Sequence, residues 1–207
     1  MTAVVQTPED VVNAALVDIG HKERVGSLYD GSEAARLSLD IFGQVRDELL
    51  RRYAPDFAMR NVTMTLLKSA PAGGGYIPGP SPWNPAVNPP PGWLFEYSYP
   101  GDCLKVRCVK QAPLLFPNVD PSDNVYQIDN DNVFSPAQRV ILCNVPSAIL
   151  VYVGRVTDPT TMDVSFVDLF CDTLGKRLAP ALTGLEAAKK AEADEAQGIA
   201  PVILEQG

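Results

Sequence analysis

Few side chains of the types that catalyse reactions at neutral pH occur in this chain, and their spacing matches no common active-site motif. The single histidine, His21, follows a predicted helix end, where an imidazole serves as a C-terminal cap. The glycine triplet at 73–75 lies in a proline-rich segment and not between a strand and a helix, so it does not match a phosphate-binding loop. No serine nucleophile elbow or zinc-protease helix motif is present. These observations argue against an enzyme, although an unfamiliar site remains an alternative.

The residues that could bind a metal are also poorly placed. The run at 129–132 begins like a calcium loop, but Val133 follows where a ligand is needed, and the required glycine and glutamate are missing. A turn between two strands is the favoured interpretation. The cysteines form no CxxC pair, and we expect buried free thiols at Cys103, Cys108, Cys143 and Cys171. We therefore expect no metal and no cofactor.

Length and composition favour a folded protein that does not bind DNA by sequence. With 207 residues, 46% hydrophobic and 20% charged, the chain is long and apolar enough to bury a core. No export signal and no stretch of about 18 apolar residues is visible, which predicts synthesis in the cytoplasm and no membrane span. The net charge of −8 repels phosphate.

Helical patterns occupy both ends of the chain. A cap at Thr7 and apolar residues at helical spacing predict a helix that ends at Gly20. A start signal at Asp30-Gly31-Ser32-Glu33 predicts a second helix that continues to about Ala54, antiparallel to the first. Near the other end, a helix from about Ser165 is expected to stop around Pro180 and Gly184. A last, exposed helix then covers 185–197.

The middle of the chain has strand patterns. Alternation at 61–66, and further runs at 94–99, 104–110, 125–128, 139–143 and 149–156, predict an antiparallel sheet. The proline- and glycine-rich stretch at 70–92 predicts an extended arm. The prediction is thus a single α+β subunit: a helical bundle built from both chain ends (8–55 and 157–197), an inserted antiparallel β-rich segment (56–156) and an extended tail (198–207).

Several motifs, in order along the chain, resemble the tail tubular protein A type of phage head-to-tail adaptor. The first half carries Ala15-Leu16-Val17-Asp18-Ile19-Gly20, Asp30-Gly31-Ser32-Glu33, Val45-Arg46-Asp47-Glu48-Leu49-Leu50 and Phe57-Ala58-Met59-Arg60. The second half carries Tyr97-Ser98-Tyr99-Pro100-Gly101-Asp102-Cys103-Leu104, Tyr152-Val153-Gly154-Arg155-Val156 and Leu182-Thr183-Gly184. The matches cover roughly residues 10 to 185, whereas 70–92 and 198–207 do not match the family's pattern.

The resemblance implies a structural virion protein made in the host cytoplasm. Such a protein forms a homo-oligomeric ring, of twelve copies, at the head-tail junction between the portal protein and the tail or nozzle proteins. Its helical part faces the portal, its β-rich part faces the tail, and DNA passes through the ring without sequence-specific binding. No enzyme activity is implied.

Three groups of residues are candidates for contacts in such an assembly. An apolar cluster beyond a polar helix predicts a portal contact or, alternatively, a tail folded back on its own helix: Ile199, Val202, Ile203 and Leu204. Trp83 and Trp93 predict contacts of the arm with the tail or a neighbouring subunit. All charged residues between Gln111 and Gln138 are acidic: Asp120, Asp123, Asp129 and Asp131. They predict a channel lining or, alternatively, an ordinary solvated loop.

Two other classes of protein remain open at this point. A monomeric β-rich binding module would present the proline-rich arm to an aromatic groove. An enzyme with an unrecognised site would show turnover and a pocket that contains titratable groups with perturbed pKa values.

Overall fold

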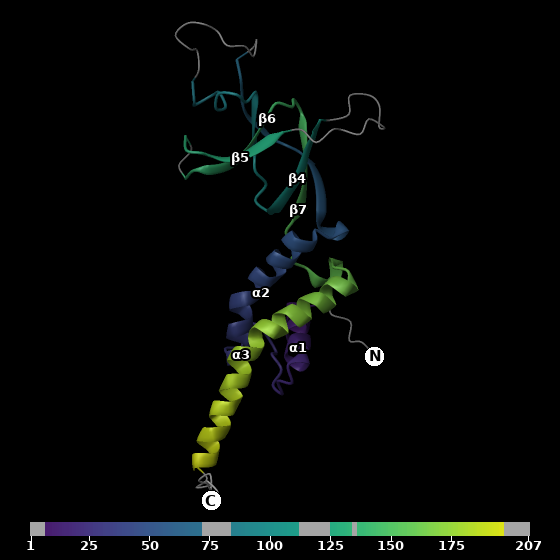
Figure 1. Cartoon of the computed structure of the whole chain (residues 1–207), viewed down its shortest axis with the longest axis vertical. Coiled ribbons are helices and arrows are strands. Elements are labelled where there is room, and N and C mark those ends of the chain that lie inside the picture. Colours follow the sequence, from purple (N-terminus) through teal and green to yellow (C-terminus); the bar gives the residue numbers. More distant parts are fainter. Residues whose placement is uncertain (1–6, 72–83, 112–124, 134–135, 197–207) are drawn as a thin grey trace, which may run out of the picture. The chain divides into compact units, whose positions relative to one another are not determined.

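The chain divides into two compact units. The computed structural model describes residues 7–71, 84–111, 125–133 and 136–196, with side chains described up to Leu182 and at Gly184. A helical unit comprises Met1–Leu49 and Val156–Gly207, and a β-rich unit comprises Leu50–Arg155. The protein is α+β, as predicted, because helices and antiparallel sheets occur together (Figure 1). In the part of the chain that the structure describes, no helix has the length and apolar composition needed to cross a bilayer.

The first helix, α1 (Pro8–Asp18), has the local signals that its sequence predicts. Thr7 and Asp10 form a capping box, in which the Thr7 hydroxyl accepts the Asp10 N–H at 3.2 Å and the Asp10 carboxylate accepts the Thr7 N–H at 3.0 Å. Gly20 has a φ of +74° just beyond the helix, and His21 N–H donates to the Leu16 carbonyl at 2.9 Å. Such a left-handed residue ends a helix at little steric cost when it is glycine.

The C-terminal helix differs from its prediction. One continuous helix, α3 (Val164–Ala196), replaces the two expected helices and passes through Pro180. Proline removes one helical hydrogen bond, but an apolar stripe in steps of four residues, Phe166, Phe170, Leu174, Leu178 and Leu182, is buried on both sides of it. The packing of this stripe outweighs the local break, which the sequence pattern alone placed at Pro180.

The partner of α1 is also not the expected one. α1 packs along α3 and not primarily against α2 (Glu33–Tyr53). At Gly175 of α3, an added Cβ would lie 2.9 Å from the Ala15 carbonyl oxygen, so only glycine permits this backbone approach. The ring of Phe42, from α2, lies 4.9 Å from that of Phe170, from α3, which joins the third helix to this core.

The β-rich unit contains two antiparallel sheets, where the sequence predicted one. The first has the strand order β1 (Met59–Thr63), β7 (Ala148–Gly154), β4 (Cys103–Gln111). The second has the order β2 (Leu66–Ser69), β3 (Phe95–Ser98), β6 (Gln138–Cys143), β5 (Tyr126–Asp131). Figure 1 shows β4 beside β7 and β5 beside β6. Short 3-10 helices at Asp56–Ala58 and Pro159–Thr161 lie in the connections.

One core joins the two sheets. Residues from both, including Tyr97, Ile141, Leu150 and Tyr152, form a single buried cluster. The predicted strand at 61–66 is in fact two strands, because the chain crosses from one sheet to the other there and buries Met64 in this core. The sequence pattern does not reveal the crossing, since polar and apolar residues alternate without a break through 61–66.

The proline-rich stretch is not wholly an exposed arm. Within its described part, 84–92, the Asn88 side chain is buried and donates to the Ser69 carbonyl at 2.8 Å, and Pro89 is buried as well. Ala70 N–H donates to the Leu94 carbonyl at 2.7 Å, which closes the base of the loop. The end of the stretch therefore belongs to the β-rich unit.

Substitution of Gly175 tests the α1–α3 contact. Because the added Cβ meets backbone and not a flexible side chain, Gly175→Ala is expected to lower the free energy of unfolding by about 1 to 3 kcal/mol. Gly43→Ala is the matched control in α2, where the nearest atom to the new Cβ is 3.9 Å away, and it should be neutral or stabilising by up to ~1 kcal/mol. Urea denaturation measures both, and equal effects would contradict the close approach.

Candidate functional site

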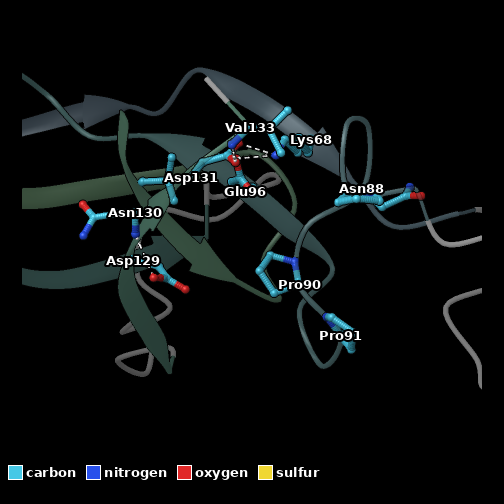
Figure 2. Close-up of a pocket in the computed structure, with 11 residues that line it drawn as sticks. Lys68, Asn88, Pro90, Pro91, Glu96, Asp129, Asn130, Asp131 and Val133 are labelled. Atoms are coloured by element: carbon cyan, nitrogen blue, oxygen red, sulfur yellow. Dashed lines mark hydrogen bonds and ion pairs between the residues drawn. The ribbon is translucent and has the colours of Figure 1, made fainter. Parts of the chain in front are cut away.

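The candidate site is a pocket of about 270 Å³ in the β-rich unit. Strands β2, β3, β5 and β6, the β5–β6 turn and the end of the proline-rich stretch supply its walls. They contribute Lys68, Pro85, Asn88, Pro90, Pro91, Glu96, Asp129, Asn130, Asp131, Val133 and Val140. In Figure 2 the Lys68 ammonium points toward the carboxylates of Glu96 and Asp131, while Pro90 and Pro91 lie on a separate segment.

Lys68, Glu96 and Asp131 form a buried charge cluster. Their exposed fractions are 5%, 1% and 8%. Lys68 Nζ forms an ion pair with Asp131 Oδ2 and lies 3.5 Å from Glu96 Oε1. Asp131 Oδ1 also accepts the Val133 N–H at 2.9 Å, which closes the turn between β5 and β6. One ammonium group thus links three strands of the second sheet.

Strand pairing places two of the three groups opposite each other, and the third comes from the far edge of the same sheet. Lys68 on β2 lies opposite Glu96 on β3, and Asp131 is the last residue of β5. A register shift between Leu66 and Lys68 interrupts the β2–β3 pairing. Such a bulge changes the alternation of side chains and lets a strand direct a charged residue toward the interior. The local structure thus accounts for the position of a cation inside the sheet.

The pKa values of the two carboxyl groups, Glu96 and Asp131, are shifted in opposite directions. Burial, and next the hydrogen bond to Asp131, raise the pKa of Glu96 to about 7, against the lowering effect of Lys68. Burial also disfavours ionised Asp131, but hydrogen bonds from Lys68, the Val133 N–H and Glu96 hold its pKa below the ordinary value. At slightly acid pH the cluster therefore holds a Lys68–Asp131 ion pair and a neutral Glu96 that donates to Asp131.

Chemically, the cluster can take up one proton near neutral pH. A perturbed carboxyl group in a pocket is also typical of catalytic acids. Here, however, Glu96, Asp131 and Lys68 contact one another, and the Glu96 Oε1 atom is buried without a hydrogen bond from any described residue. Within the described ranges, no three His, Cys, Asp or Glu side chains are arranged to hold a metal ion. The contacts favour a structural role in which the charges fix the strands.

The sequence-based candidate residues have different outcomes. Asp131 is buried and bound to Lys68, so it does not line a channel surface as predicted, and the predicted turn at 129–132 is partly strand β5. Asp129 is half-buried at the pocket, and Trp93 is half-buried after the proline-rich stretch. The other candidates lie outside the described residues: Trp83, Asp120, Asp123, Ile199, Val202, Ile203 and Leu204.

Sequence reasoning missed Lys68 and Glu96 entirely. The only available signal was a charged residue inside each apolar strand, in Leu66-Leu67-Lys68 and in Phe95-Glu96-Tyr97. Two opposite charges in neighbouring strands are a weak indication of a pair, because most such residues lie on solvated faces.

The protonation of Glu96 predicts a specific pH dependence. Its pKa rises from 4.5 in the unfolded chain to about 7 in the folded one, so its stabilising effect is complete below pH 4.5 and is lost as pH rises to about 7. Each pKa unit corresponds to about 1.4 kcal/mol, which predicts a loss of a few kcal/mol over this window. Glu96→Gln keeps a donor to Asp131 and should remove this decline.

Urea denaturation at pH 4.5, 5.5, 6.5 and 7.5 measures the difference between the wild type and Glu96→Gln. The exposed Glu23→Gln variant is the matched control and should follow the wild type. Parallel curves for the wild type and Glu96→Gln would show that folding does not raise the pKa of Glu96.

Removal of the buried cation should be costly. Lys68→Met leaves two carboxyl groups without their cation and should lower the free energy of unfolding at pH 8 by about 3 to 5 kcal/mol. Lys176→Met removes an exposed ion pair with Asp172 and should cost less than about 1 kcal/mol. Combining Lys68→Met with Glu96→Gln and Asp131→Asn should recover part of the loss, and no recovery would argue against the electrostatic explanation.

Comparison of the chain with models of known protein families gave no match, and comparison with curated proteins gave none either. Function is therefore inferred from the order of the sequence motifs and from the contacts of the described residues.

Proposed function

We propose that this chain is a ring-forming head-to-tail adaptor of a tailed bacteriophage. In this role it connects the portal to the tail in the virion, lines the DNA exit channel and catalyses no reaction. Twelve copies form the ring, the helical unit binds the portal, and the β-rich unit binds tail or nozzle proteins. The observation that carries the proposal is the division of the chain, in which a β-rich unit is inserted between two chain ends that share one helical unit.

This division supports the proposal because an adaptor must bind two different partners. The helices of the two chain ends pack against each other through α1 and α3, and we propose that with α2 they form the bundle that meets the portal. The β-rich unit has its own core between two sheets. Each unit can therefore bind one partner, and this binding need not change the fold of the other unit.

The charge of the chain is compatible with a DNA channel. A net charge of −8 keeps phosphate contacts few, so DNA can slide. We propose Asp120, Asp123 and Asp129 as lining residues, whereas Asp131 serves the buried cluster. Trp83 and Trp93 remain the proposed contacts with the tail or a neighbouring subunit.

Two other functions are distinguished by simple observations. A monomeric binding module would bind through the proline-rich stretch, but Asn88 and Pro89 at its end are buried in the β-rich unit. An enzyme at the Lys68 pocket would lose turnover in Glu96→Gln, whereas the adaptor proposal expects that variant to assemble normally at pH 6. The contacts described above favour the adaptor.

Portal binding tests the proposal and its C-terminal contact together. The full-length chain, mixed with purified portal rings, should attach as a ring visible by negative-stain electron microscopy. A chain truncated after Gln197 loses the apolar residues Ile199, Val202, Ile203 and Leu204 and should attach with much lower occupancy. Mass photometry of the complexes measures the number of attached subunits.

The control for this truncation is a full-length variant in which the four apolar residues are replaced by serine. If both variants attach as well as the wild type, the tail is not the portal contact. If the wild type itself does not attach, the adaptor proposal fails.

A further inference from the structure

Charge is divided unequally between the two units. The helical unit has 8 Lys and Arg against 18 Asp and Glu, a formal net charge of −10, whereas the β-rich unit has 9 against 7, a net charge of +2. In a chain with a net charge of −8, cations are expected to be interspersed among a larger number of carboxylates. The β-rich unit instead has more cations than carboxylates.

Five exposed cations of the β-rich unit are here termed the cationic patch: Arg51, Arg52, Lys105, Arg107 and Arg139. Arg51 Nε donates to the Leu104 carbonyl at 3.3 Å, and Lys105 Nζ donates to the Arg51 carbonyl at 3.4 Å, which places these two side by side. Arg107 follows Lys105 by two residues on edge strand β4 and, like it, is exposed.

Arg139 extends the cationic patch through Tyr99. Its guanidinium lies 4.5 Å from the centre of the Tyr99 ring. Burial raises the pKa of the Tyr99 hydroxyl to about 12, and the charges of Arg139 and Arg51 both oppose this rise, so both lie within electrostatic reach of Tyr99. Arg52 neighbours Arg51 and lies over the ring of Tyr53 at 5.6 Å.

The cationic patch has no anionic partner within its own chain as far as the structure describes it. All five side chains are exposed, and none forms an ion pair with another described residue. Four cations outside the patch, Arg60, Lys68, Lys176 and Arg177, are by contrast each paired with a carboxylate. Cations that have no ion pair among the described residues and lie near one another repel, and an anionic partner would relieve this repulsion.

We propose that the cationic patch docks on the helical unit of a second copy of this chain. The helical unit, with a net charge of −10, is opposite in charge to the patch, and a contact between two different surfaces of identical subunits is heterologous. Heterologous contacts close into rings when the rotation allows. The inference thus rests on the proposed ring and names the interface that builds it.

A charge-reversed variant tests the cationic patch. Arg51→Glu, Lys105→Glu and Arg107→Glu together should weaken self-association at least about tenfold, because two like-charged surfaces would then meet. Lys22→Glu, Arg24→Glu and Arg36→Glu change the net charge equally but make the helical unit more acidic, so this control should associate at least as well as the wild type. Sedimentation velocity of the full chain at about 50 mM salt measures both, and about 500 mM salt should weaken the wild type by screening.

The identity of the partner surface is tested by cross-linking. A mixture of unlabelled and ¹⁵N-labelled chains is treated with a carbodiimide, which joins an amine to a carboxylate in direct contact. Lys105 should appear in mixed-isotope pairs with carboxylates of the helical unit. Pairs with carboxylates of the β-rich unit, or no mixed pairs at all, would overturn the proposal.

Two further outcomes separate this inference from the proposed function. A wild-type chain that stays monomeric at low salt overturns the inference, while attachment to portal rings is still read independently. Equal weakening by the patch variant and by the control also overturns it. Salt-sensitive association that the patch variant abolishes supports the inference even if the chain does not bind a portal.

Discussion

Gly175 allows the backbone of α3 to approach that of α1 so closely that no other residue fits, and this contact ties the two ends of the chain together. The chain leaves the helical unit after Leu49 and returns to it at Val156. The residues between these points, Leu50 to Arg155, form the β-rich unit. The β-rich unit has a core of its own between its two sheets.

A second constraint acts inside the β-rich unit. Burial of Lys68 requires anionic partners, and these come from two other strands, Glu96 on β3 and Asp131 on β5. Apolar side chains would allow a strand to slip by two residues, whereas a buried ion pair fits one register only. While Glu96 is protonated, the charges of Lys68 and Asp131 cancel, which lowers the free-energy cost of burying the three groups.

Local signals in the sequence predicted what local interactions determine. The Thr7 cap, the glycine at position 20 and the short strand-forming runs of β3, β4, β6 and β7 act over a few residues, and the corresponding elements lie close to where they were expected. The continuation of α3 past Pro180 and the crossing at Met64 depend on packing against distant residues. The Lys68 cluster joins residues up to 63 positions apart, and no spacing rule along the chain relates them.

Cryo-electron microscopy of purified virions that contain this chain would reveal or exclude an adaptor ring between portal and tail. We expect a ring of twelve copies beneath the portal, with the helical unit toward the portal and the β-rich unit toward the tail. The cationic patch of each copy should lie against the helical unit of its neighbour. Absence of this chain from the portal vertex would refute the proposed ring, as would a single, unringed copy at that position.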